Sequence, residues 1–354
     1  MAYTNGLDKP SDYFVTKLFT GNGSNGHAIS GLDFQPDWVW LKNRNTGNTH
    51  EAFDSVRGAT KTLYPDRSDA EYVNSTGSLT SFNSDGFTVG SGDGANKSGS
   101  GIASWNWKAG TSFTNDASAT GIGSIDSSGS VNTDAGFSII SWTGDGNNGA
   151  TIAHGLGVTP AIVITKRRSA VGDWLVGGST INTARGGANS LLLLNTTAAM
   201  DSNSEVYQTF SSTTFQVGVN AYANTSGSTM ISYCFAEKQG YSKFGSYTGN
   251  GSTDGTFVYT GFKPAWLLVK STAANDWILH DTKRNPHNVS NVTLFPNGSD
   301  ADVTNTIYNQ DILSNGFKAR TTHARLNGSG VTYIYMAIAE NPFVTSTGVP
   351  ATAR

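Results

Sequence analysis

The feature that most constrains the fold of this 354-residue chain is an internal repeat that occurs three times. Each copy opens with a Thr-Gly-Asx-Gly turn, a short strand-like segment, a proline and an apolar run. Each closes with a Phe-centred segment, a Gly/Ser turn and a longer run rich in aromatic residues. The proline and the phenylalanine are 51, 55 and 53 residues apart in the pairs Pro36 and Phe87, Pro160 and Phe215, and Pro264 and Phe317. Two ordered motifs at matched spacing indicate three divergent copies of one module of roughly 100 residues.

The repeat also predicts the domain organisation. A chain of this length suits two or three domains rather than one core. Copies two and three are joined directly, so we expect them to pack rigidly, whereas a Ser/Thr/Asp/Gly-rich segment before copy two is typical of a flexible linker. The expected boundaries are 1–12 for an N-terminal arm, 13–110 for copy one, 111–134 for the linker, 135–240 for copy two, 241–343 for copy three and 344–354 for a polar C-terminal tail.

Composition favours strands over helices. Charged residues make up only 14% of the chain and glycine occurs 42 times, which disfavours helices and favours short strands joined by tight turns. The runs DWVWLK, AIVITK and AWLLVK are typical of strands buried on both faces, and FTVG and FQVGV alternate like half-buried strands. The middle of each copy has little pattern and is expected to form loops. We predict an all-β chain of three tandem β-sandwich modules of the jelly-roll, lectin-like type.

Several classes of function are disfavoured. A formal net charge of −3 provides no basic face for nucleic acid. No apolar run approaches the length of a membrane span, and the N-terminal segment lacks the pattern of a secretory signal, so we expect no membrane insertion. The single cysteine, Cys234, lies in an apolar run and is expected to be a buried, inert thiol.

The chain contains no recognisable catalytic motif. The six histidines lack HExxH spacing, and the five glutamates include no pair at strand spacing that would suit a glycosidase. Asp66, Asp69 and Glu71 lie in a polar loop and are expected to be solvated. Asp145 and Asn147 suit an Asx turn better than a calcium loop, because the distal glutamate of such a loop is missing. We expect no catalysis, no catalytic residue, no metal and no cofactor.

Two recurring polar features are candidates for ligand contact. The first is the lysine that follows each apolar run, Lys42, Lys166 and Lys270; the structural alternative is a charged residue that ends a buried strand and extends to water. The second is the Asp-x-x-Arg pair, which copy two lacks. Its structural alternative is a turn-stabilising ion pair. The two pairs are Asp54 with Arg57 and Asp281 with Arg284.

Tryptophans are the third candidate feature. Trp174 and Trp277 follow polar turns, so we expect them to be exposed and available to a ligand such as a sugar. Four others lie in apolar strands and are expected in the core. These four are Trp38, Trp40, Trp105 and Trp107.

Several segments resemble a family of repeat-containing virion proteins. The segments PSDYFVTKLFTGNG, FQPDWVWLKNR, FDSVRGATK, SDGFTVG and NPFVTSTGVPATAR are similar to proteins that tailed bacteriophages, many from marine hosts, encode and that are described as tail-fibre-like or adhesin-like. The resemblance covers nearly the whole chain and is weakest in copy two. It implies a component of the phage particle, assembled in the bacterial cytoplasm, with lectin-like β modules and no catalytic residues to carry over.

Three functions remain open. The first is a tail fibre or tail-tip adhesin that contacts the host surface, where repeated modules would give avidity. The second is a purely structural head decoration or tail adaptor, and the third is a glycan-degrading tail spike, which the missing carboxylate pair disfavours. The expected partners are other virion proteins and a host surface glycan. We also expect a homo-oligomer, a trimer before other states, although no heptad repeat specifies the number.

Overall fold

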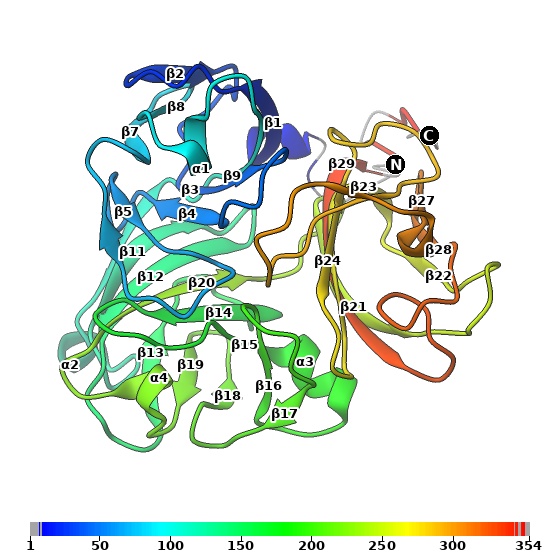
Figure 1. Ribbon diagram of the computed structural model, residues 1–354. Coiled ribbons are helices and arrows are strands. Elements are labelled where there is room, and N and C mark those ends of the chain that lie inside the picture. Colours follow the sequence, from blue (N-terminus) through cyan, green and yellow to red (C-terminus); the bar gives the residue numbers. More distant parts are fainter. Residues whose placement is uncertain (1–6, 8, 343, 346–347, 351–354) are drawn as a thin grey trace.

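In the computed structural model, the described residues are 7, 9–342, 344–345 and 348–350. They form several antiparallel sheets and only short helices. The three copies make three lobes that meet at a common centre, blue for copy one, green for copy two and orange for copy three (Figure 1). The chain is therefore mostly β, as predicted.

Each copy contains the same four-stranded sheet, here called its inner sheet. The first strand of the copy pairs with the last, the last pairs with the strand that carries the apolar run, and this strand pairs with the one that follows it. The inner sheets are β1 (Phe14–Thr20), β9 (Gly101–Trp107), β3 (Trp38–Asn43) and β4 (Glu51–Asp54) in copy one; β12 (Phe137–Thr143), β20 (Thr229–Phe235), β14 (Ile162–Arg167) and β15 (Leu175–Gly177) in copy two; and β21 (Ser242–Thr248), β29 (Thr332–Pro342), β23 (Phe262–Ser271) and β24 (Trp277–Asp281) in copy three.

Each copy also contains a three-stranded outer sheet, in which the strand after the opening turn pairs with the strand around the closing phenylalanine. These sheets are β2 (His27–Ser30), β8 (Gly86–Val89) and β7 (Leu79–Asn83); β13 (Ala150–Ala153), β19 (Thr214–Val217) and β18 (Tyr207–Phe210); and β22 (Phe257–Tyr259), β28 (Gly316–Ala319) and β27 (Gln310–Leu313). The triplication that the two sequence motifs predict is thus repeated in strand order.

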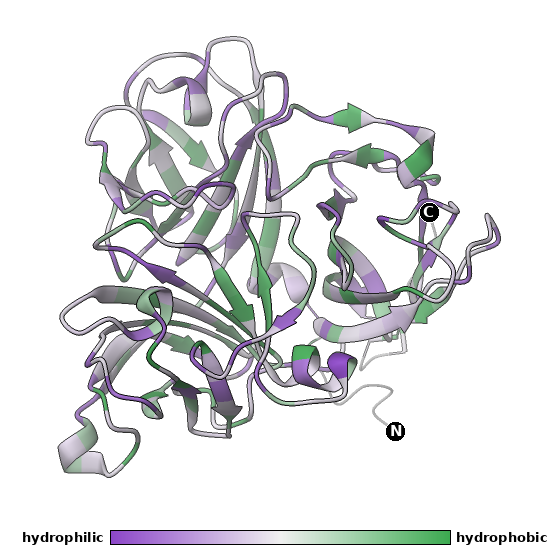
Figure 2. Cartoon of the chain, turned by 60° about the horizontal axis from the view of Figure 1, so that its bottom comes forward, coloured by the Kyte–Doolittle hydropathy of each residue, from purple (hydrophilic) through white to green (hydrophobic). Residues whose placement is uncertain are grey.

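The alternation of side chains explains why the apolar runs are buried on both faces. In β3, Trp38 and Trp40 point into a central cluster that residues of all three copies share, whereas Val39 and Leu41 point into a cluster of copy one alone. The corresponding strands β14 and β23 divide their side chains in the same way. In Figure 2 the strands carry most of the hydrophobic segments. The predicted burial of Trp38, Trp40, Trp105, Trp107 and Cys234 is confirmed.

Residues 111–134 differ from the flexible linker that the sequence suggests. They form β10 (Thr111–Asn115), α2 (Ala117–Thr120) and β11 (Ser127–Asn132), and the two strands extend the inner sheet of copy two. Phe113 and Val131 pack against the core of copy two. These two apolar anchors order a segment whose overall composition is polar.

The remaining elements are short. At the opposite edge of the inner sheet of copy two, β16 (Ser190–Leu193) and β17 (Asp201–Ser202) continue the sheet beyond β15. Small hairpins occupy the same place in the other copies. These are β5 (Lys61–Thr62) with β6 (Tyr72–Val73), and β25 (Val292–Thr293) with β26 (Val303–Thr304). Besides α2, the described helices are η1 (Pro10–Asp12), α1 (Asp93–Asn96), α3 (Ser179–Arg185), α4 (Ala221–Asn224) and η2 (Thr306–Tyr308).

The ends of the chain lie partly outside the described residues. Within the predicted arm, the Leu7 N–H donates to the Gln239 carbonyl (3.1 Å), and η1 lies beside β29. Of the predicted tail, the structure describes 344–345 and 348–350. No helix among the described residues is long and apolar enough to cross a bilayer.

The Thr-Gly-Asx-Gly turns are fixed by an asparagine that is buried in every copy. In copy two, Asn224 accepts from the Asp145 N–H (3.1 Å), and its amide donates to the Asn147 carbonyl (2.9 Å). The Asn147 N–H in turn donates to the Asp145 carboxylate (2.9 Å), which confirms the predicted Asx turn. Asn96 and Asn327 make the equivalent bonds in the other copies.

Candidate functional site

The lysines, tryptophans and ion pairs that the sequence suggests as ligand contacts lie where the three copies meet. In each copy a loop after the apolar strand pair lies against the next copy; we call these the junction loops, at 64–71, 193–200 and 295–302. Their last residues donate backbone hydrogen bonds of 2.8 Å to a neighbouring copy: Glu71 N to Arg168 O, Met200 N to Thr272 O, and Asp302 N to Arg44 O. Copy two therefore binds the loop of copy one, copy three that of copy two, and copy one that of copy three. The junctions close a ring with pseudo-threefold symmetry.

The three lysines lie inside these junctions. Lys42, Lys166 and Lys270 are fully buried. Lys42 donates to Ser299 O (3.0 Å) of copy three, and Lys166 to Ser68 O (3.0 Å) of copy one. The expectation that these side chains extend to water is wrong, because all three are buried, and a junction loop of another copy covers Lys42 and Lys166.

Burial changes the ionisation of these lysines. It lowers the pKa of each of the three ammonium groups to about 8. Their hydrogen bonds go to backbone carbonyls, including Asn48 O (2.7 Å) for Lys42 and Gly172 O (2.6 Å) for Lys166. Lys270 donates to Ser271 O and Ala273 O, each at 3.0 Å. The lysines therefore fix loop backbones at the junctions.

Trp174 and Trp277 are also junction residues. Only 0% and 4% of their surfaces are exposed, so the expected exposure is wrong. Their indole N–H groups donate across the junction to Tyr64 O and Leu193 O, both at 2.8 Å. The turn before Trp174 also contacts a neighbouring copy, since the Gly172 N–H donates to Ser68 O (2.8 Å), whereas Ala273 and Ala274 in the turn before Trp277 are exposed. In copy one the same position is His50, whose Nδ1 accepts from the Trp40 indole (2.9 Å).

The predicted turn-stabilising ion pairs exist, and they are buried. Asp54 with Arg57 and Asp281 with Arg284 are each 2.5 Å apart, and their side chains are 0% exposed. Each carboxylate also accepts a bond from another copy: Asp54 from the Tyr233 hydroxyl (2.7 Å), and Asp281 from Nε1 of Trp105 (3.2 Å). Each pair thus stabilises a turn in its own copy and joins it to a neighbour.

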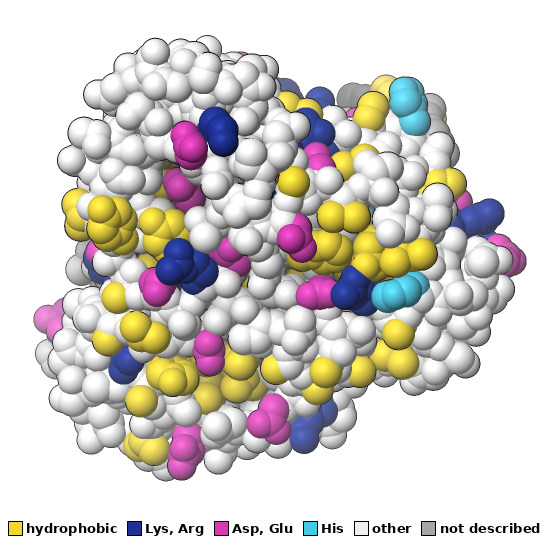
Figure 3. Space-filling model, viewed as in Figure 1, with side chains coloured by type: hydrophobic (Ala, Val, Ile, Leu, Met, Phe, Trp, Pro, Cys, Tyr) yellow, Lys and Arg dark blue, Asp and Glu magenta, His cyan; other side chains and the backbone are white. Residues whose placement is uncertain are grey.

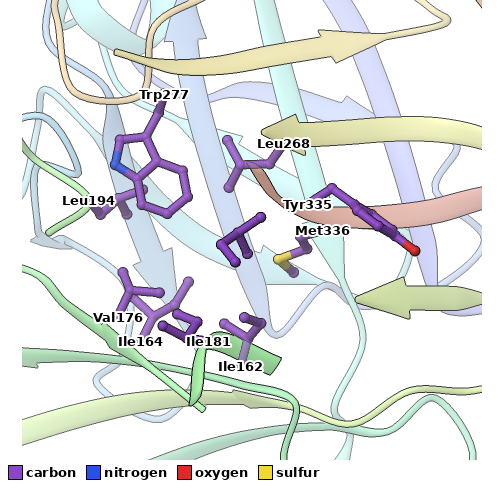
Figure 4. A pocket seen from close by; sticks show the side chains of 10 residues that line it. Ile162, Ile164, Val176, Ile181, Leu194, Leu268, Trp277, Tyr335 and Met336 are labelled. Carbon is purple, nitrogen blue, oxygen red and sulfur yellow. The ribbon is translucent and has the colours of Figure 1, made fainter. Parts of the chain in front are cut away.

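At the third junction, between copies two and three, apolar residues or glycine replace every member of this buried polar group. Gly178 and Ile181 occupy the places of the aspartate and arginine in copy two, and Met336 occupies that of Tyr233 and Trp105 in copy three. Ile181 and Met336 line an apolar cavity of about 10 Å³; most of the labelled side chains point toward it, whereas the Tyr335 ring points away (Figure 4). That volume is at the lower limit for one water molecule. Because all the partners change together, no buried charge is left unpaired.

A further group of titratable residues lies at the start of β4. Burial raises the pKa of Glu51 to about 7 and that of Asp66 to about 6. Burial, together with the charge of Lys42, holds the pKa of His50 well below its usual value. Glu51 is only 8% exposed, so it would reach a substrate only after the surrounding structure opened.

The prediction that Asp66, Asp69 and Glu71 are solvated is correct only for Asp69. Asp69 is exposed and pairs with Arg67 (2.5 Å). Glu71 instead binds Arg168 (2.9 Å) and Arg57 (3.1 Å). Burial alone would raise the pKa of Glu71, but these two arginines lower it. Among the described residues there is no group of three or more histidine, cysteine, aspartate or glutamate side chains that could bind a metal ion.

The chain is thus a mostly β protein in which three related copies close into one body through buried junctions. It belongs to the family described as a domain of unknown function, DUF7483, whose model matches residues 9–342. No curated protein and no solved structure matches the chain.

Proposed function

We propose that this chain is a structural protein of a tailed-bacteriophage particle, and that it contacts the host surface as an adhesin, without catalysis. We further propose that each copy is a sandwich of the jelly-roll type, since its inner and outer sheets share one hydrophobic cluster. The resemblance of the opening and closing motifs to virion proteins supports the setting in the particle.

One observation carries the adhesin proposal: aromatic side chains are exposed at positions where the other copies have none. Tyr72 is 57% exposed and Tyr259 is 59% exposed. The position of Tyr72 is occupied by Asp201 in copy two, and that of Tyr259 by Ser30 in copy one. The fold forms without these aromatics, so their exposure favours contact with another molecule.

A second candidate is a head decoration or tail adaptor. The closed ring favours it, because a three-lobed body can contact each subunit of a trimeric partner in the same way. Further association of the chain into homotrimers also stays a proposal. Light scattering would test it against the 37.3 kDa of one chain.

The decisive test is binding of fluorescently labelled protein to candidate host cells, with and without periodate oxidation of their surface sugars. The adhesin proposal predicts saturable binding that oxidation abolishes. If the folded protein does not bind, the adhesin proposal fails and the structural role becomes the leading one.

A further inference from the structure

Copy one has a surface groove at the outer side of its junction loop. Its lining consists of two tyrosines, an arginine, two acidic residues and an alanine: Tyr64, Arg67, Asp69, Ala70, Glu71 and Tyr72. Its volume is about 410 Å³, and it is a shallow groove that is open to solvent. In Figure 3, hydrophobic side chains gather at the left edge beside β5, the strand that pairs with β6.

The groove offers flat apolar surface together with polar groups. Tyr72 and its neighbour Val73 are 57% and 61% exposed. The Arg67 guanidinium lies over the Tyr64 ring, 5.4 Å from its centroid. Aromatic rings pack well against the C–H faces of a sugar, while charged side chains nearby can bond its hydroxyl groups.

The charges of the groove are balanced. Arg67 and Asp69 form an ion pair at the rim, with side chains 52% and 41% exposed. Glu71 is neutralised from behind by Arg57 and Arg168. An anion would meet Asp69 and a cation would meet Arg67, whereas an uncharged ligand could bond to both groups. The balance therefore favours an uncharged ligand that is rich in hydroxyl groups.

Copy two provides an internal comparison. The pairing of Thr62 with Tyr72 in β5 and β6 recurs as the pairing of Leu191 with Asp201 in β16 and β17. The equivalent groove in copy two, of about 360 Å³, is lined by Leu191, Leu193, Ala198, Ala199, Met200 and Asp201. The groove thus forms without the tyrosines, the arginine and the exposed ion pair. These residues are additions to copy one that folding does not require.

The loop that forms the groove is held at several points. Tyr64 O accepts from Trp174 (2.8 Å), Ser68 O accepts from the Gly172 N–H (2.8 Å), and the Glu71 N–H donates to copy two. A ligand would therefore order little additional backbone when it binds.

We propose that the groove lined by Tyr64, Arg67 and Tyr72 binds an uncharged glycan that stacks on the exposed ring of Tyr72. This inference rests on the proposed adhesin function and assigns its contact to one place in copy one.

The test uses the full chain and an array of neutral hexose and N-acetylhexosamine oligosaccharides, with uronic-acid and sialylated oligosaccharides as the charged set. The variants are Tyr72→Asp, which introduces the copy-two residue, and Tyr72→Phe, which keeps the ring. Val158→Ser is the control, because it removes an exposed hydrophobic side chain, 44% exposed, elsewhere on the surface. Thermal unfolding would verify that all three fold.

We expect binding to a neutral glycan that Tyr72→Asp weakens at least tenfold, while Tyr72→Phe and Val158→Ser retain it within about twofold. If host-cell binding is periodate-sensitive but unchanged in Tyr72→Asp, the groove is not the site, although the adhesin function stands. Absence of cell binding by the wild-type protein would instead overturn the function. Binding of charged glycans alone, or self-association that Tyr72→Asp abolishes, would overturn the assigned ligand.

Discussion

The buried pair of Asp54 and Arg57 gives the sharpest prediction about the ring. Arg57 donates to Asp54, Glu71, Ala52 O and Lys61 O. The substitution Arg57→Ile, which introduces the copy-two residue, would leave the Asp54 carboxylate buried without its cation. Breaking such a pair from one side costs about 3–5 kcal/mol.

This cost converts into a measurable shift in melting temperature. An unfolding entropy of about 2.1 cal/mol/K per residue gives about 0.74 kcal/mol/K for the 354 residues, so Arg57→Ile should lower Tm by about 4–7 °C. The triple variant Asp54→Gly, Arg57→Ile and Tyr233→Met copies the apolar junction and removes the charges together. We expect it to unfold at a higher temperature than Arg57→Ile alone.

Calorimetry at pH 7 on the wild type, the single variant and the triple variant measures both effects, with Arg57→Lys as the charge-retaining control. A shift below about 1 °C for Arg57→Ile would refute the claim that the pair joins the copies. A triple variant less stable than Arg57→Ile would refute the claim that the polar group is replaceable as a unit.

Three further predictions follow from buried polar groups. Burial raises the pKa of Glu51 to about 7, so the stability that its protonated form contributes is present below about pH 4.5 and is lost as the pH rises to about 7. Glu51→Gln should therefore be more stable than the wild type at pH 8 by about 3 kcal/mol and equal to it at pH 4, which urea titrations at the two pH values would reveal. The Cys234 thiol is buried and its pKa is raised to about 12, so native protein should not react with a thiol reagent at pH 8 and denatured protein should react with one equivalent; reaction of the native protein would contradict this burial. Asn224→Ala should cost about 1–3 kcal/mol, because the Asp145 N–H and the Asn147 carbonyl of the opening turn lose their partner, and an unchanged urea midpoint would show that Asn224 does not fix the turn.

Burial was predicted correctly for tryptophans whose neighbours in the sequence are themselves apolar. Trp38 and Trp40 lie in an apolar run, so local pattern suffices to place them in a core. Trp174 and Trp277 follow polar turns, and local pattern predicts exposure. Their burial depends on junction loops of other copies, which lie 110 and 84 positions away in the chain. Contacts at such separation leave no local periodicity.

The lysines and residues 111–134 show the same limit in two forms. The spacing of Lys42 from its proline indicates a strand end, but only the ring shows that Ser299 of copy three covers it. Most of residues 111–134 are polar, so the average composition gives little weight to Phe113 and Val131, whose side chains anchor two strands. Average composition predicts flexibility there, whereas two well-placed apolar side chains and a free sheet edge are enough to order the segment.

Comparison of the copies separates structural residues from candidates for binding. Lys42, Lys166 and Lys270 recur in every copy and are buried at the junctions, so their recurrence reflects the ring. The Asp-x-x-Arg pairs change together with their aromatic partners, as expected of residues that contact one another across a junction. Tyr72 and Arg67 change independently of any junction bond and are exposed. In a triplicated chain, then, repetition of a polar residue indicates how the copies associate, and ligand chemistry is better sought where one exposed surface differs from its two counterparts.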